Sequence, residues 1–243
     1  MSANPRPARI LIVVAMEAEA RPVRAALGLH AEPASLHPAF PSAMAADGPL
    51  AVATNGTDPR FEIDAIASQP AVVTTLTAAE SHRPDLVISA GTAGGFEGRG
   101  GAIGDVFVST EPVRFHDRRV DIPGWDAYGE GSYPVADLGP ERDDLLSAMG
   151  AKPGRMTTGN SLDAPPVDLA TMDRFGADAK DMEAAAVAWV CEHLGVDFLA
   201  VKAITDLVDH PEATAEQFRR NLGLATERLA AAVGSLVGAL CAA

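Results

Sequence analysis

The chain has few cysteines, few basic residues and no long apolar run, and each scarcity narrows the class of protein. Its two cysteines, Cys191 and Cys241, lack metal-ligand spacing and are too few for a disulfide framework, so a reducing, cytoplasmic location is expected. Only 19 basic residues stand against 33 acidic ones, which gives a net charge of −14. Nucleic-acid binding needs clustered lysine and arginine, so we expect no nucleic-acid partner.

Membrane and metal sites are not expected either. The apolar run at residues 10–16 is too short for a signal core or a membrane span, and no other window comes near 18 apolar residues. The six histidines show neither H-x-x-x-H nor H-E-x-x-H spacing, so no metal site is predicted.

Apolar runs and helical periods alternate along the chain, which predicts one α/β domain over residues 1–243 with a mostly parallel sheet. Strands are predicted at residues 10–15, 50–54, 85–89, 104–110 and 197–204, with an extended segment at 155–158. Helices are predicted at residues 17–27, 63–82, 169–175, 181–194 and 214–240. The other segments are expected to be a disordered tail (1–8), a loop or weak hairpin forming a surface connection (30–48) and an irregular loop (112–134).

The K-D-M-E and I-T-D segments place three acids near one strand end. Asp181 and Glu183 open a predicted Ala-rich helix, and Asp206 follows the last predicted strand. Ligands of open α/β sheets bind beyond the carboxyl ends of the strands, so these carboxylates can face one pocket. Asp206 alone also fits a capping role before Pro211. Its pairing with Glu183 favours a reaction that needs a proton donor and a hydroxyl-binding acceptor.

Two earlier motifs each allow a structural and a functional interpretation. In A-M-E-A-E-A (15–20), at a strand-to-helix turn, the acids complement the helix dipole, or one of them is a general base. A-G-T-A-G-G-F (90–96) follows a strand and is either a plain turn or a place where backbone approaches a ligand closely. It does not match the G-x-G-x-x-G pattern of dinucleotide sites.

Two later motifs are equally open. R-F-H-D-R-R (114–119) can mimic a catalytic cluster, but consecutive residues on an extended chain point in opposite directions, which favours a polar network or subunit contact. T-G-N-S-L-D (158–163) looks like a strand leaving into a loop. That loop is either an ordinary Asx-type turn or a source of backbone groups for a flat base.

In series, these segments resemble the nucleoside phosphorylase/nucleosidase superfamily, and within it the plant-type branch of the 5′-methylthioadenosine/S-adenosylhomocysteine nucleosidases. They span nearly the whole chain in the family's order, except for residues 30–48. The carrying segments are V-V-A-M-E-A-E-A-R-P-V (13–23), S-A-G-T-A-G-G-F (89–96), I-G-D-V-F-V (103–108), F-H-D-R-R (115–119), G-R-M-T-T-G-N-S-L-D (154–163), K-D-M-E-A-A-A-V-A (180–188) and V-K-A-I-T-D-L-V-D (201–209).

The resemblance implies a fold, a substrate and an assembly. The fold is a three-layer α/β/α sandwich around a mixed, mostly parallel twisted sheet. The substrate is a small-molecule nucleoside cleaved in methionine salvage. Members of this type are usually homodimers in which the neighbour closes the pocket, so Phe115 and nearby apolar residues of the 112–134 loop are expected to cover the 5′-substituent.

The resemblance also implies roles for single residues. Glu19 matches the base that activates the attacking water, and Asp206 matches the acid that protonates adenine N7. Glu183 would bind the ribose hydroxyls, with Met182 packed on the sugar. The remaining substrate-binding positions are Thr92, Ala93, Gly94, Ser161, Leu162, Asp181 and Thr205.

This allocation fits the chemistry of N-glycosidic cleavage, which passes through an oxocarbenium-like sugar. Adenine leaves readily only when protonated, so the acid must hold a proton while the base is ionised. The apolar strand end before Asp206 is expected to raise the pKa of its carboxyl. No cofactor or metal is required.

Other functions on the same fold remain open at this point. A phosphorylase needs cations around phosphate, but Ser89 stands where related phosphorylases carry an arginine, and Glu19 adds negative charge, so water is the predicted nucleophile. A nucleosidase for another 6-amino purine nucleoside and a non-catalytic nucleoside-binding module are the further alternatives. Asn160 stands where the family commonly has aspartate, which puts base recognition in question.

Overall fold

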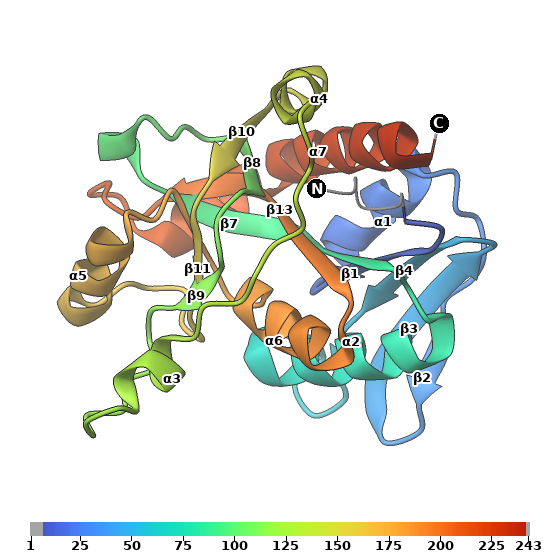
Figure 1. Ribbon diagram of the computed structural model, residues 1–243, viewed down its shortest axis with the longest axis horizontal. Helices are drawn as coiled ribbons and strands as arrows, with labels where there is room; N and C mark the ends of the chain where they lie inside the picture. Colours follow the sequence, from blue (N-terminus) through green and yellow to red (C-terminus); the bar gives the residue numbers. More distant parts are fainter. Residues whose placement is uncertain (1–6, 242–243) are drawn as a thin grey trace.

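The computed structural model describes residues 7–241, which form one large mixed sheet with helices on both faces (Figure 1). The strands are β1 (Ile10–Val14), β2 (Ala34–His37), β3 (Phe40–Asp47), β4 (Leu50–Thr54), β5 (Thr57–Asp58), β6 (Ile63–Asp64), β7 (Leu86–Gly95), β8 (Val106–Ser109), β9 (Arg114–Phe115), β10 (Ala151–Gly154), β11 (Met156–Thr158), β12 (Ala179–Asp181) and β13 (Asp197–Leu207). The helices are α1 (Glu17–Ala26), α2 (Ser68–His82), α3 (Asp126–Glu130), α4 (Arg142–Met149), α5 (Pro166–Phe175), α6 (Ala184–Leu194) and α7 (Thr214–Cys241), with a 3₁₀ turn at Glu97–Arg99.

The sheet runs in the order β10-β8-β13-β7-β1-β4-β3-β2, and β12, β11 and β9 branch from β7. The central strands β13, β7, β1 and β4 are parallel, whereas β12 and β8 pair antiparallel with β7 and β13. The β2–β3 hairpin adds two antiparallel strands beyond β4. The sheet is therefore mixed, as expected.

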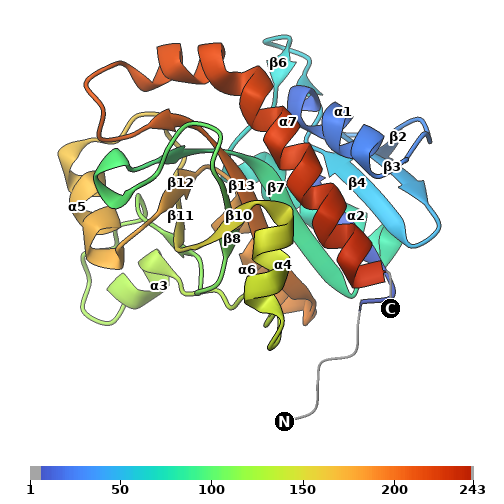
Figure 2. The ribbon, with the colours of Figure 1, turned by 90° about the horizontal axis from the view of Figure 1, so that it is seen from above.

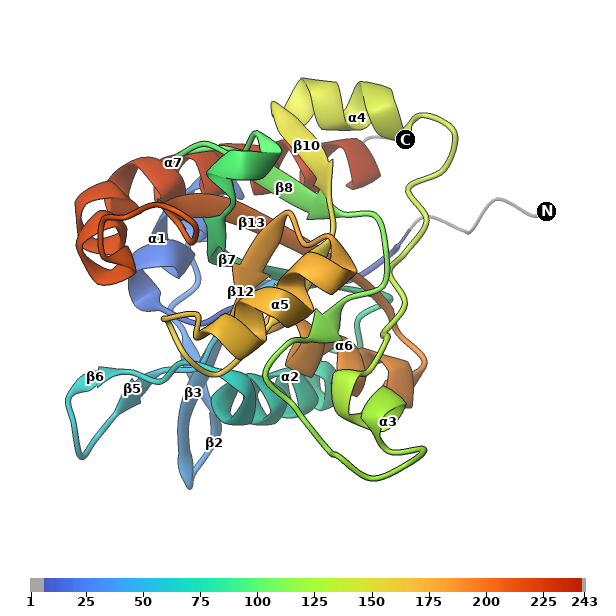
Figure 3. The same ribbon diagram turned by 90° about the vertical axis from the view of Figure 1, so that its left-hand side faces the viewer.

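Strand β1 explains why the sheet lies between two helical layers. All five of its residues are buried. Since side chains of alternate residues point to opposite faces, both faces of the sheet must be covered. Ile10, Ile12 and Val14 join the core under α1, α4 and α7, while Leu11 and Val13 join the core over α2 and α6. Figure 3 shows these two layers on either side of the sheet, which confirms the expected three-layer sandwich.

Helix α7 corrects one expectation. It contains an 18-residue window of mean hydropathy 1.4, long and apolar enough by length and composition to cross a membrane. Figure 2 shows α7 lying along the sheet beside α1. Leu229, Val233 and Leu236 on its inner face are fully buried. The apolar character of α7 is thus explained by its place in the core.

Several predicted boundaries were wrong, and the last predicted strand runs on to Leu207, so Asp206 lies within β13 and does not follow it. Residues 63–64 form β6 of a small hairpin with β5, and α2 starts only at Ser68, with Pro70 in its first turn, where a missing N–H costs least. Asp181 ends strand β12 and does not open α6, which begins at Ala184. Strand β7 continues through the glycines to Gly95, so A-G-T-A-G-G is strand and not a turn.

Two expectations for the N-terminal part of the chain also changed. Residues 30–48 contain a hairpin, as one interpretation allowed, but β3 pairs with β4 and so belongs to the sheet and is not a mere surface connection. Residues 1–6 of the tail predicted at 1–8 lie outside the described residues. The N–H groups of Ala8 and Arg9 donate to Asp85 Oδ2, each at 2.9 Å, so the chain is already anchored there.

Candidate active site

A cavity opens beyond the carboxyl ends of β13, β7 and β1, which are neighbours in the sheet. Each strand, or the turn that follows it, contributes residues to the wall of the cavity. Glu19 stands in the first turn of α1 just after β1, Thr92 to Gly94 lie near the end of β7, and Asp206 lies near the end of β13. This is the position at which open α/β sheets bind ligands.

Glu19 is held by donors from two elements. Its Oε1 accepts the backbone N–H and the hydroxyl of Thr92, both at 2.7 Å, and its Oε2 accepts the N–H of Met16 at 3.2 Å. The side chain is 2% exposed, and this burial raises the pKa of its carboxyl although the hydrogen bonds from Thr92 and the charge of Lys202 oppose the rise. A carboxylate with a raised pKa at a cavity wall suits proton transfer.

The glycines of β7 let two acids approach the strand closely. A Cβ on Gly91 would lie 3.4 Å from Glu19 Oε1 and 3.3 Å from Lys202 Nζ. A Cβ on Gly94 would lie 2.8 Å from Asp206 Oδ2, closer than real contacts allow. The A-G-T-A-G-G sequence is therefore a strand whose glycines make room for carboxylates.

A β-bulge determines where Asp206 lies. The pairing of β13 with β7 matches Ile204 to Ala93 and Asp206 to Gly94, which leaves Thr205 as the extra residue. Bulges of this kind re-aim side chains beside active sites. Burial raises the pKa of the Asp206 carboxyl, while the Thr205 hydroxyl, which donates to Asp206 Oδ1 at 2.8 Å, and the charge of Lys180 lower it in part.

Glu183 lies at the N-terminal end of α6 and also lines the cavity. The backbone N–H of Ala67 donates to Glu183 Oε1 at 2.9 Å. Enclosure of the carboxyl raises its pKa to about 7, and Lys202 only partly offsets the rise. Met182 beside it also lines the cavity, so this wall presents one carboxylate and one thioether.

Lys202 and Asp181, which itself lines the cavity, form a buried ion pair at 2.8 Å. Asp181 also accepts the hydroxyl of Thr158 at 2.5 Å and the N–H of Ala184 at 2.8 Å, so its oxygens are taken up within the protein. Burial would lower the pKa of Lys202, but the carboxylates of Asp181 and Glu183 outweigh it and raise that pKa. Lys202 thus supplies the positive charge that three neighbouring acids require.

Comparisons with known proteins agree with this arrangement. Residues 9–238 match the model of the phosphorylase superfamily. The chain belongs to this superfamily. It is 38% identical to a 5′-methylthioadenosine nucleosidase of Arabidopsis thaliana over 90% of this chain and 82% of that protein. It is 35% identical to a 5′-methylthioadenosine/S-adenosylhomocysteine nucleosidase of the same plant over 90% of this chain and 87% of that protein.

Solved structures extend the comparison. The superfamily member described here matches the apo structure of the Arabidopsis thaliana 5′-methylthioadenosine nucleosidase with a TM-score of 0.90 and 34% identity, covering 97% of both chains. Futalosine hydrolase of Helicobacter pylori matches with a TM-score of 0.79 at 21% identity, over 95% of this chain and 97% of that one, which shows a shared fold. The resemblance inferred from the sequence is confirmed by these relatives.

Most residues singled out from the sequence meet at this cavity. Those that line it are Glu19, Thr92, Ala93, Gly94, Leu162, Asp181, Met182, Glu183, Thr205 and Asp206. Ser161 is exposed and does not line it. Phe115 does not line this cavity either: its ring packs edge-on against Tyr133 in the core and is 4% exposed.

Sequence reasoning missed other lining residues, namely Ala15, Met16, Ile66, Lys180 and Phe218. Lys180 stands next to the acids of the K-D-M-E motif, which was the available signal. Its ammonium is buried and donates to the carbonyls of Leu162 and Asp163 at 2.6 and 2.5 Å. Ile66 and Phe218 come from a connecting segment and from α7, where no motif marks them.

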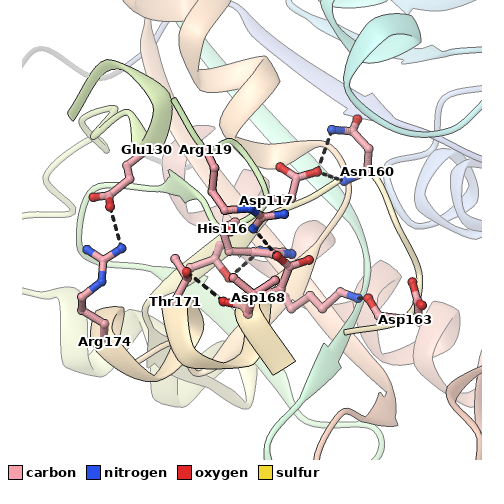
Figure 4. A network of polar contacts seen from close by, with 12 residues as sticks. His116, Asp117, Arg119, Glu130, Asn160, Asp163, Asp168, Thr171 and Arg174 are labelled. Carbon is pink, nitrogen blue, oxygen red and sulfur yellow. Dashed lines mark hydrogen bonds and ion pairs between the residues drawn. The ribbon is translucent and has the colours of Figure 1, made fainter. Parts of the chain in front are cut away.

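The R-F-H-D-R-R segment forms a polar network beside the cavity, as the structural interpretation predicted (Figure 4). Arg119 pairs with Asp168, and Asp117 accepts two hydrogen bonds from Asn160. His116 is buried, and burial together with Lys180 lowers its pKa to about 4, so the ring is neutral at pH 7. Among residues 7–241, no group of three or more His, Cys, Asp or Glu side chains is placed to hold a metal ion.

Proposed function

We propose that the protein is a nucleosidase that hydrolyses the N-glycosidic bond of 5′-methylthioadenosine to adenine and 5-methylthioribose. The observation that carries the proposal is the meeting of Glu19, Glu183 and Asp206 at one cavity beyond three adjacent strands. Two relatives that match nearly the whole chain bear the names of 5′-methylthioadenosine nucleosidases, and one of these names includes S-adenosylhomocysteine, which we propose as a second substrate.

The roles follow from the environments of the acids. Asp206 is the general acid: its raised pKa favours the protonated form that adenine N7 needs before it leaves. Glu19 is the general base that takes a proton from water, and it becomes able to do so when ionised. Glu183 binds the ribose hydroxyls through the oxygen that Ala67 leaves free. Charge develops on the sugar, and the carboxylates on both sides stabilise it.

Water is the proposed nucleophile. Phosphate would need cations, and among the described residues that line the cavity Lys180 is the only one. Its ammonium already donates to the carbonyl groups of Leu162 and Asp163. Ser89, where related phosphorylases carry an arginine, is buried within β7 and pairs with Val13.

We further propose a homodimer in the cytoplasm, acting in methionine salvage. Exposed apolar side chains support the dimer, because α2, α6 and α3 lie on one side of the molecule (Figure 3) and carry Leu76, Trp189 and Tyr128. Light scattering after gel filtration tests this assembly: a mass near twice 25.1 kDa supports it, and a monomer contradicts it.

The activity is tested by mixing the purified protein with 5′-methylthioadenosine in phosphate-free buffer and following free adenine by chromatography. Prompt release, unchanged when phosphate is added, is the expected result. Release only with phosphate would make the protein a phosphorylase. If no adenine were released under either condition, the proposed substrate would be wrong.

A further inference from the structure

Helix α2 begins without a capping side chain of its own. The residue that precedes its first turn is Ala67, whose backbone has φ 78° and ψ −173°. This region is populated almost exclusively by glycine, so Ala67 is strained. Its N–H is the group that donates to Glu183 Oε1 at 2.9 Å. A strained backbone position therefore helps to orient one carboxylate of the cavity.

A distant loop supplies the missing cap. The first N–H groups of a helix have no partner within the helix and are normally satisfied by a nearby polar side chain. In this protein the side-chain oxygen of Asn160 accepts the N–H of Ser68, the first residue of α2, at 3.1 Å. Asn160 stands two residues before Leu162, which lines the cavity, and is not itself part of the cavity wall.

Asn160 is itself fixed by Asp117. Both its backbone N–H and its side-chain amide donate to Asp117 Oδ2, at 2.7 and 3.0 Å (Figure 4). The amide can satisfy Asp117 and Ser68 together in only one orientation, with nitrogen toward the carboxylate and oxygen toward the N–H. The loop is seated firmly, since a Cβ on Gly159 would lie 2.2 Å from His116 Nε2.

We propose that Asn160 is a positioning residue for ribose binding: its amide ties Asp117 to the start of α2 and thereby holds the Ala67 N–H against Glu183. The inference rests on the proposed function in one respect, that Glu183 binds the sugar. It also answers the question raised by Asn160 in the sequence. The side chain faces Asp117, where an aspartate would bring like charge, and it is not part of the cavity wall.

The test compares Asn160→Ala, Asn160→Asp and the exchange Asp117→Asn/Asn160→Asp. Asp85→Ala is the matched control, because it removes two backbone hydrogen bonds at the amino-terminal end of β7, opposite to the end at which the cavity lies. We measure kcat and KM for 5′-methylthioadenosine, and the Kd of adenine by calorimetry. Adenine lacks the ribose, so its affinity reports the base side alone.

Asn160→Ala is expected to lower kcat/KM roughly five- to tenfold, the factor by which loss of a helix cap usually shifts a folding equilibrium, with the Kd of adenine unchanged. Asn160→Asp is expected to lower it further, because two carboxylates then face each other. The exchange variant is expected to recover most of the loss, since Asn at 117 can donate to Asp at 160. A parallel loss of adenine affinity, an unchanged kcat/KM in Asn160→Ala, or no recovery in the exchange variant would overturn the proposal.

Amide hydrogen exchange separates this inference from the proposed function. In the free protein, Asn160→Ala should speed exchange at Ala67 and Ser68 at least fivefold relative to Asp85→Ala, and the exchange variant should restore protection. If the wild type does not cleave 5′-methylthioadenosine, the proposed substrate fails while this measurement still decides the contact. Unchanged exchange at both amides would overturn the positioning role.

Discussion

Lys202 places its ammonium 2.8 Å from Asp181 Oδ2, and both side chains are 1% exposed. The same lysine is the main positive charge near Glu183 and also acts on Glu19. A buried ion pair adds little net stability compared with apolar residues, but loss of one partner leaves an uncompensated charge. The positive charge of Lys202 therefore offsets the repulsion among Asp181, Glu183 and Glu19 at this cavity.

Lys202→Met tests this balance. We expect it to lower the free energy of unfolding by about 3–5 kcal/mol, measured by urea denaturation at pH 7, because Asp181 is left buried and unpaired. Lys202→Met/Asp181→Asn should recover part of the loss. Lys152→Met is the control: its pair with Asp105 is exposed, and it should cost no more than about 1 kcal/mol. Equal losses in the two single variants would contradict the prediction.

Glu19→Gln is expected to lower kcat by about 10²–10⁴-fold, because the amide cannot accept a proton from water. Nucleoside binding should persist, since the remaining oxygen can still accept the two hydrogen bonds from Thr92. Stopped-flow or chromatographic rates and calorimetric binding separate the two effects. Glu17→Gln provides the comparison, because Glu17 is exposed and paired with Arg24, and it should keep the wild-type rate. A Glu19→Gln enzyme that retains wild-type kcat would show that another group is the base.

The pH dependence of kcat should be bell-shaped. Burial raises the pKa of the Asp206 carboxyl, and activity is lost as the pH rises through that value because the acid no longer holds its proton. Activity is lost on the acid side as Glu19, whose pKa is also raised by burial, becomes protonated. Asp206→Asn should remove activity at every pH. A kcat that stays flat from acid to alkaline pH would exclude this pair of roles.

Stability should depend on pH through Glu183. Its folded-state pKa is raised from 4.5 to about 7, so the folded state binds this proton more tightly than the unfolded state. Its contribution is fully present below pH 4.5 and is lost as the pH rises through 7. Urea midpoints at pH 5 and pH 8 should differ in that direction, and Glu183→Gln should reduce the difference. A difference of the same size in the variant would mean that other groups cause it.

Gly94→Ala is expected to reduce kcat/KM about 10²-fold without unfolding the protein. The added Cβ would lie 2.8 Å from Asp206 Oδ2 and 2.7 Å from Val208 Cγ2, so the acid must move, and small displacements of a catalytic group cost about this much. Gly238→Ala in α7 meets nothing within 4 Å and should leave the kinetics unchanged. Thermal melting confirms that both variants are folded, and equal kinetics in the two would refute the steric argument.

The sequence was informative where structure is local. The run at residues 10–15 is apolar throughout, and residues 10–14 of it form a strand buried on both faces. Glu19 follows the end of β1 and Asp206 lies near the carboxyl end of β13, so both acids meet at the carboxyl ends of the strands. The glycines at 91–95 allowed either a turn or a close backbone approach, and the turn interpretation failed because β12 and β13 pair with that stretch.

What the sequence alone determined is the α/β class, the carboxyl ends at which ligands bind, and a series of motifs specific enough to identify the superfamily. Tertiary structure decided the rest, because it depends on neighbours far apart in the chain. The bulge at Thr205 sets the direction of Asp206, Lys202 neutralises acids from other elements, and the long-range contacts of Asn160 cap α2. Phe115 pointed into the core for the same reason: side-chain direction follows strand register, which no local pattern records.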